Sequence, residues 1–190
     1  MSISFRSNLI SSSTKKITLQ GNTRIVGDID GNVFTSGRVG QTVTVRYDTK
    51  SSWSVPVSSN TIVTAMNVTI TPKYNTSKIL LTYVVSYETT NNCVWRLGKN
   101  GTEFVRNTTD GSRWSGFAVG MYDGDVDTTP ASETFLFVDS PATTSAITYN
   151  LMIGSAGASA STLQMNRPYN SAGADAREAA ISYVIAQEIY

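Results

Sequence analysis

The acidic residues of this chain include one run with the spacing of a cation-binding loop. Asp123, Asp125 and Asp127 occupy alternate positions, as the first ligands of a calcium-binding loop do. Such a loop continues with Gly at its sixth position and Glu at its twelfth, where this chain has Thr128 and Thr134. We therefore interpret the run as a solvated turn between strands, with calcium binding as the alternative.

Two carboxylates at a suitable separation could also hydrolyse a glycosidic bond. The residues available for such a pair are Asp110, Asp123, Asp125, Asp127 and Glu133. They fall in predicted turns rather than in an aromatic-lined cleft, and 190 residues is short for a depolymerase. We therefore expect no catalytic residues, no cofactor and no resident metal, and a glycan-degrading enzyme is the alternative.

Missing residue types exclude most other catalytic chemistry. The chain has no His, which excludes Ser-His-Asp and Cys-His mechanisms and His-ligated zinc. Its only cysteine, Cys93, cannot form an intrachain disulfide. Alternation over residues 93–97 places Cys93, Trp95 and Leu97 on one face of a strand, which predicts a buried structural thiol and a core tryptophan.

The charge of the chain is balanced, with 15 Lys and Arg residues against 14 Asp and Glu residues. Proteins bind nucleic acids largely through an excess of positive charge, which releases counterions from the phosphates. This chain has no such excess, so we expect no nucleic-acid partner. Arg96, Arg106 and Arg113 cluster around one predicted hairpin, where a solvated sheet face is the expected setting. The first residues lack a signal-peptide pattern, and the apolar stretch 79–85 is far shorter than the ~20 residues that cross a bilayer, which predicts cytoplasmic synthesis and no membrane insertion.

Composition and alternation favour strands joined by turns. The chain contains 24 Ser, 25 Thr and 14 Gly residues, which are typical of strands and their connections. Residues 78–87 are apolar on both faces, which predicts a central strand, and Asn100-Gly101 predicts a type I′ hairpin between 93–97 and 102–106. Further strands are expected at 41–47, 66–71, 114–122, 133–139, 146–153, 162–165 and 180–190. The predicted inward set is Phe117, Val119, Met121, Phe135, Phe137, Ile147, Tyr149, Leu151 and Ile153. The expected fold is all-β, an antiparallel β-sandwich of the jelly-roll type with a short N-terminal β arm.

The pattern of apolar and turn residues changes near residue 40. In residues 1–40, short apolar pairs are separated by Gly-Asn and Gly-Asp turns, and Ile17, Ile25 and Val33 recur at a spacing of eight. Such short strands bury too little apolar surface to be ordered alone, so we predict an arm that docks or intertwines, followed by a head at 41–190. The predicted docking residues of the arm are Ile17, Leu19, Ile25, Val33 and Phe34.

Two aromatic residues are candidates for contact with a partner. Trp114 follows a Gly-Ser turn and Tyr122 precedes the acidic run, so both lie near predicted loops. Large aromatics at such positions contribute to interfaces, although packing within the subunit is the commoner role.

Four segments carry a resemblance to a known group of proteins. They are residues 37–43 (GRVGQTV), 68–81 (VTITPKYNTSKILL), 96–101 (RLGKNG) and 182–189 (SYVIAQEI). With them, residues 37–190 resemble bacteriophage virion surface proteins whose domain is similar to the trimeric jelly rolls of tumour-necrosis-factor and complement-type heads. The resemblance implies a homotrimer and no catalytic residues.

Together these features predict a non-enzymatic virion component whose arm docks to other virion proteins of the capsid, collar or tail. The head would act either as a tail-fibre or spike tip that attaches to a host-surface glycan or protein, or as a capsid decoration (cement) protein without host contact. The short arm is too small for a long fibre, which keeps decoration close as an alternative.

Overall fold

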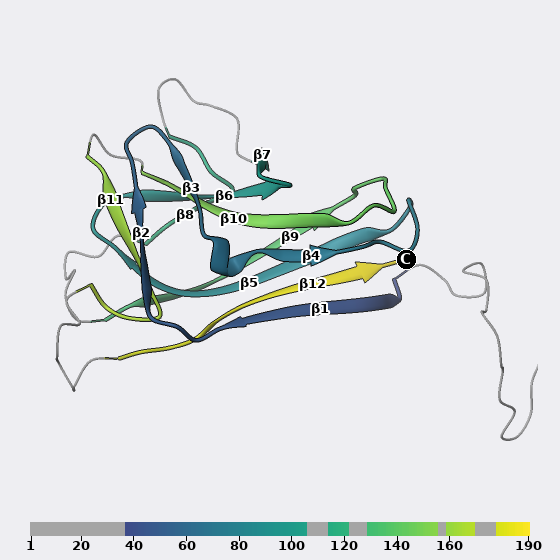
Figure 1. The fold of residues 1–190 in the computed structure, drawn as a ribbon, viewed down its shortest axis with the longest axis horizontal. Helices are drawn as coiled ribbons and strands as arrows, with labels where there is room; N and C mark the ends of the chain where they lie inside the picture. The colour runs from purple at the N-terminus through teal and green to yellow at the C-terminus, as the bar shows by residue number, and fades with distance from the viewer. Residues whose placement is uncertain (1–36, 106–113, 122–128, 156–158, 170–177) are drawn as a thin grey trace, which may run out of the picture. The chain divides into compact units, whose positions relative to one another are not determined.

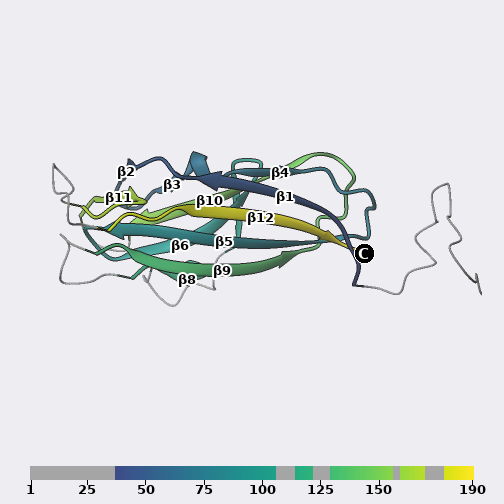
Figure 2. The ribbon, with the colours of Figure 1, turned by 90° about the horizontal axis from the view of Figure 1, so that it is seen from below.

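The alternating segments of the sequence pair into two antiparallel sheets that pack face to face (Figures 1 and 2). The computed structural model describes residues 37–105, 114–121, 129–155, 159–169 and 178–190, all of which belong to the unit Phe34–Tyr190. No helix within these ranges is long and apolar enough to cross a membrane. The prediction of an all-β antiparallel sandwich is confirmed.

Each sheet of the described chain has six strands. Sheet A contains β1 (Val39–Tyr47), β2 (Ser51–Val55), β5 (Lys78–Thr89), β9 (Ala131–Asp139), β11 (Ser161–Met165) and β12 (Ser182–Ile189). Sheet B contains β3 (Asn60–Ile62), β4 (Val68–Ile70), β6 (Cys93–Lys99), β7 (Thr102–Val105), β8 (Ala118–Val119) and β10 (Ile147–Ser155). A single 3-10 turn (Thr64–Met66) precedes β4.

The strand order within the sheets is that of a jelly roll. In sheet A, β5 pairs with β9 along one edge and with β12 and then β11 along the other, and β1 and β2 lie beyond these. In sheet B, β10 pairs with β6 on one side and with β3 and β4 on the other, while β7 and β8 pair with the far edge of β6. The chain crosses between the sheets after β2, β4, β5, β8, β9 and β10, so neighbours in one sheet are mostly distant in sequence.

The core between the sheets is built around Trp95. This side chain is fully buried and makes edge-on contact with Tyr87 at a ring separation of 5.0 Å and a tilted contact with Phe135 at 5.6 Å. Cys93 is buried beside it, as predicted, and burial raises the pKa of its thiol, which keeps the group protonated. Phe135 and the inward residues of β10 are also buried, while Phe117 and Phe137 are half-buried against the core.

Two residues of the predicted inward set face solvent instead. Val119 is 74% exposed and Met121 is 56% exposed. The predicted strand 114–122 is reduced to the two residues of β8, in which Ala118 pairs with Trp95 and Val119 pairs with Val94. Residues paired across two strands point to the same face of the sheet. Trp95 faces the core, so its partner Ala118 faces the core and Val119 points outward. The prediction that Val119 and Met121 point inward with Phe117 was therefore wrong.

The predicted hairpin between β6 and β7 is confirmed. Asn100 and Gly101 have φ values of 52° and 83°, the left-handed conformation that a type I′ turn requires at both central positions. The turn is also tied to β10, because Gly101 N donates to Asn150 Oδ1 at 2.8 Å and Thr148 N donates to Asn100 Oδ1 at 2.9 Å. The asparagine therefore serves both the turn conformation and the attachment of the hairpin to its neighbouring strand.

A buried asparagine holds sheet A together where β5 changes partner from β12 to β11. Asn166 is fully buried, and its Nδ2 donates to the carbonyl oxygens of Tyr47 and Thr49 at 2.9 and 3.1 Å. Ser182 Oγ donates to Asn166 Oδ1 at 2.7 Å, and Ser86 N donates to Ser182 Oγ at 3.0 Å. One side chain thus connects the end of β1, the end of β11 and the start of β12.

Replacing this asparagine is expected to weaken the whole head. Asn166→Ala removes two part-buried hydrogen bonds to the carbonyls of Tyr47 and Thr49 and leaves the buried Ser182 hydroxyl without its acceptor, so we expect the free energy of unfolding to fall by about 3 kcal/mol. The control is Asn91→Ala, which removes one bond to the carbonyl of Ala160 from a partly exposed side chain. Urea unfolding followed by tryptophan fluorescence measures both, and equal losses would contradict the assignment.

Candidate functional site

The outer face of sheet A presents apolar side chains to solvent. Leu136 and Val138 of β9 point outward and are 64% and 51% exposed. The register places Leu136 beside Thr82 and Val138 beside Leu80 on β5, and the outward residues of β12 continue the rows on the other side. We call this set the A-face; its apolar members are Leu80, Val84, Leu136, Val138, Tyr183, Ile185 and Ile189.

The centre of the A-face carries no charge. The outward positions of β9 and β12 within their described lengths hold Ser, Thr, Gln, Tyr and aliphatic residues. Among the described residues of β1, β5, β9 and β12, the charged outward positions are Lys78 and Glu88 at the two ends of β5 and Arg46 on β1, which forms an exposed ion pair with Asp48 at 3.4 Å. Figure 2 shows β9, β5, β12 and β1 side by side in this order across the sheet. A contiguous uncharged apolar patch of this kind marks an interaction surface.

A buried carboxylate fixes the end of sheet A at which the described chain begins and ends. Glu188 on β12 is fully buried. Its Oε1 accepts hydrogen bonds from Ser77 Oγ at 2.7 Å and from Lys73 N at 2.6 Å, and its Oε2 accepts one from Gln41 Nε2 at 2.7 Å. The carboxylate thus joins β12, β1 and the turn at 72–77 before β5.

The hydrogen bonds outweigh the cost of burying this charge. Burial alone would raise the pKa of Glu188, but the bonds from Ser77, from Gln41 and from the backbone amides of Lys73 and Tyr74 hold the pKa below its usual range. The folded protein therefore stabilises the ionised form of the Glu188 carboxylate. The first described residues and the last residue lie beside it, since Gly37 N and Arg38 N donate to Tyr190 O at 3.1 and 2.9 Å.

Trp114 packs on the outer face of sheet B rather than extending from it. The Arg96 guanidinium lies 4.4 Å from the centre of the Trp114 ring, and a Cβ on Gly154 would come within 2.6 Å of the indole nitrogen. Arg96 also donates to Ser115 O at 2.6 Å and forms an ion pair with Glu103 at 2.9 Å. The prediction of a solvated setting is wrong for Arg96, which is only 3% exposed, because the segment after residue 113 folds over it.

A second, partly buried ion pair lies at the end of the core near Gly37 and Tyr190. Lys99 Nζ lies 2.7 Å from Asp139 Oδ2, and Tyr149 Oη donates to the same oxygen at 2.6 Å. Lys99 belongs to sheet B and Asp139 to sheet A, so the pair connects the two layers. The Lys99 ammonium also lies 4.5 Å from the centre of the Phe104 ring.

Most of the site residues predicted from sequence lie outside the described residues. These are the arm residues Ile17, Leu19, Ile25, Val33 and Phe34, the contact candidate Tyr122, the acidic residues Asp110, Asp123, Asp125 and Asp127, and the arginines Arg106 and Arg113. Of the two contact candidates, only Trp114 is described, and it is half-buried. Glu133 is half-buried on the inward side of β9, opposite Val85. Within the described ranges, no group of three His, Cys, Asp or Glu side chains could hold a metal ion.

The two-sided apolar pattern of residues 78–87 predicted a strand that needs cover on both faces, but sequence reasoning missed the contribution of β9 to the A-face and the role of Glu188. The signal for the A-face was present, because Leu136 and Val138 alternate with the inward residues Phe135 and Phe137 in one strand. Four consecutive apolar residues, as at 135–138, are typical of a strand that is covered on both faces. Glu188 gave no local signal, since its partners at residues 41, 73 and 77 lie more than a hundred positions away.

No protein-family model matches the chain, and a search of curated proteins finds no match.

Neutralising the buried carboxylate is expected to destabilise the head. Glu188→Gln turns an oxygen that accepts hydrogen bonds into an amide that faces other donors, so we expect a loss of about 2–3 kcal/mol in the free energy of unfolding. Glu178→Gln is the matched control, because Glu178 is exposed, and it should change this free energy by less than about 0.5 kcal/mol. Chemical denaturation of both variants at neutral pH measures the difference.

The same carboxylate predicts a pH dependence of stability. The pKa of Glu188 is lowered in the folded state, so its contribution is fully present above the unfolded-state pKa of about 4.3 and is lost as pH falls through the lower folded-state pKa. Between about pH 6 and pH 3, the difference in unfolding free energy between the parent chain and Glu188→Gln should therefore shrink. A difference that stays constant over this range would show that the charge of Glu188 contributes nothing.

Proposed function

We propose that this chain is a non-enzymatic structural protein of a bacteriophage virion, a homotrimeric jelly-roll head joined to an N-terminal docking arm and displayed on the particle surface. The observation that carries the proposal is the A-face, an uncharged apolar surface across the centre of a sheet. Apolar surface of this extent stays soluble when it is covered by another protein surface.

A second copy of the same chain is the partner that the A-face fits best. Because its centre has no charged group, packing A-faces against copies of this head buries no unpaired charge there. The charged residues Lys78 and Arg46 at its margins would stay in contact with water at the rim. Closed symmetric assembly is the usual outcome for such a surface, and the trimeric order follows from the resemblance of residues 37–190 to trimeric virion heads.

The described charged side chains with buried partners support a structural role. Glu188, the Arg96–Glu103 pair and the Lys99–Asp139 pair each join separate strands. Cys93 is held protonated in the core. These groups connect strands within and between the two sheets. A particle component that has no disulfides needs such contacts for its stability.

The position of the chain ends supports display of the head on an anchored arm. Gly37, the first described residue, is hydrogen bonded to Tyr190, so the preceding residues join the head at the end where the chain also finishes. An arm that docks to the particle would thus be joined to the head at the end that carries Gly37 and Tyr190. This arrangement suits a fibre or spike tip, and it also suits a decoration protein whose head covers neighbouring capsid subunits.

Self-association through the A-face is tested by charge substitution. The parent chain should elute as a particle of about three times the 20.5 kDa subunit mass in size-exclusion chromatography with light scattering. Leu136→Glu places a carboxylate in the proposed interface and should yield monomers. Val119→Glu is the matched control, because Val119 is an equally exposed apolar residue on sheet B, and it should stay trimeric. A monomeric parent chain at micromolar concentration would contradict the proposal.

The non-enzymatic assignment has its own test. The purified chain should release no reducing sugar from bacterial surface polysaccharide over prolonged incubation, because the proposal gives it no catalytic carboxylate pair. Turnover that is lost in Asp123→Asn or Asp125→Asn would replace the structural role with a glycan-degrading one. Immunogold labelling of intact virions separates the two structural roles, since a tip protein labels the tail and a decoration protein labels the capsid.

A further inference from the structure

The turn between β6 and β7 contains two neighbouring residues that can react with each other. Asn100-Gly101 is the only Asn-Gly pair in the sequence, and both residues are exposed at the tip of the hairpin. In such a pair, the backbone nitrogen of the glycine can attack the side-chain carbonyl carbon of the asparagine. Glycine offers the least hindered nitrogen for this attack, because it carries no Cβ.

Both reacting groups are hydrogen bonded to β10. Gly101 N, which would be the nucleophile, donates to Asn150 Oδ1 at 2.8 Å. Asn100 Oδ1, which belongs to the carbonyl that would be attacked, accepts from Thr148 N at 2.9 Å, and Asn100 N donates to Thr148 O at 2.8 Å. The attack requires Gly101 N to lose its proton and the Asn100 side chain to move toward it. The tip of the hairpin therefore has to open from β10 first, which is a local event rather than global unfolding.

Asn150 is held in place as the acceptor for the glycine nitrogen. Its side chain is buried, and its Nδ2 donates to Asn67 Oδ1 at 2.9 Å. Because the amide nitrogen is used by Asn67, the amide oxygen is the atom that faces Gly101 N. Asn150 therefore keeps the reactive N–H of Gly101 occupied for as long as the hairpin stays on β10.

We propose that Asn100 is a site of spontaneous deamidation and that Asn150 sets the rate of this modification in the folded head. The Gly101 nitrogen loses its proton to hydroxide and forms a bond to Asn100 Cγ. The bond from Cγ to the side-chain nitrogen breaks, and this nitrogen takes a proton from water and leaves as ammonia. Water then opens the resulting five-membered succinimide at either carbonyl, which leaves aspartate or isoaspartate at position 100. The inference goes beyond the proposed function and does not depend on it.

The two products have different consequences for the hairpin. Aspartate keeps a side-chain oxygen that can accept from Thr148 N. Isoaspartate adds one atom to the backbone of a two-residue turn, which the type I′ geometry does not accommodate. β7 would then lose its register with β6, and the packing of Phe104 on Phe137, at a ring separation of 5.7 Å, would be disturbed. Formation of isoaspartate would thus limit the lifetime of the folded head.

The experiment follows deamidation of the full chain over time in mildly alkaline buffer by peptide mass spectrometry. Conversion should occur at Asn100, more slowly in the folded chain than in the chain unfolded by urea, because unfolding breaks the bonds to β10. Asn150→Ala removes the acceptor of Gly101 N and should speed conversion about fivefold, the factor that corresponds to the loss of one hydrogen bond. Asn150→Asp keeps an acceptor at this place and should convert at a rate close to that of the parent chain.

Thr69→Val is the matched control, because it removes the hydrogen bond between the hydroxyls of Thr69 and Thr148 on β10 and leaves both bonds of the turn intact. Its rate should equal that of the parent chain. The inference would be overturned by equal rates in Asn150→Ala and the parent chain, by equal acceleration in Thr69→Val, or by a folded parent chain that converts as fast as the unfolded one. Should a melting curve show that Asn150→Ala is unfolded, Asn150→Leu takes its place, because leucine has a similar volume and no acceptor.

Discussion

Strand β5 has to be paired along both edges and covered on both faces, because its side chains are apolar on both. Its inward residues, including Leu81, Tyr83 and Val85, are fully buried against sheet B. Its edges are occupied by β9 on one side and by β12 and β11 on the other. Its outward residues Leu80 and Val84 remain only half-covered in the single subunit. This incomplete cover of β5 is the reason that we propose the A-face as an interaction surface.

Buried polar side chains connect strands of sheet A at places where backbone hydrogen bonds between the strands end. Asn166 joins strand ends where β5 changes partner, and Glu188 joins β12 to β1 and to the turn before β5. Each of these groups is hydrogen bonded to several segments, so its burial is compensated in one arrangement of the chain and costly in others. The sandwich therefore reaches a defined geometry without an intrachain disulfide.

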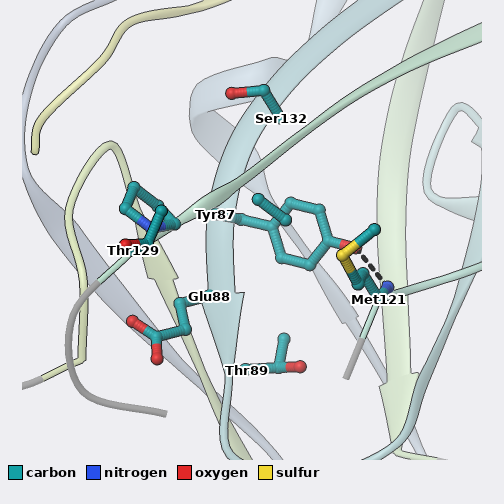
Figure 3. Close-up of a pocket in the computed structure, with 8 residues that line it drawn as sticks. Tyr87, Glu88, Thr89, Met121, Thr129 and Ser132 are labelled. Carbon is teal, nitrogen blue, oxygen red and sulfur yellow. Dashed lines mark hydrogen bonds between the residues drawn. The ribbon is translucent and has the colours of Figure 1, made fainter. Parts of the chain in front are cut away.

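The two ends of the sandwich have different consequences for function. The end with Gly37 and Tyr190 is where the preceding segment joins, and it is fixed by Glu188 and the Lys99–Asp139 pair. The opposite end carries a pocket with a buried tyrosine as its floor (Figure 3). The described sandwich thus has one end fixed by buried polar contacts beside Gly37 and Tyr190 and an apolar face on sheet A.

The sequence by itself determined the all-β class, the central position of residues 78–87, the burial of Cys93 and Trp95 and the turn at Asn100-Gly101. These features depend on alternation and on turn residues, which act over a few neighbouring positions. Only the tertiary structure decided that Arg96 is covered by Trp114, that Val119 faces solvent and that Glu188 organises one end of sheet A. In a jelly roll, strands that touch are far apart in sequence, so the surroundings of a side chain depend on pairings that no local pattern contains.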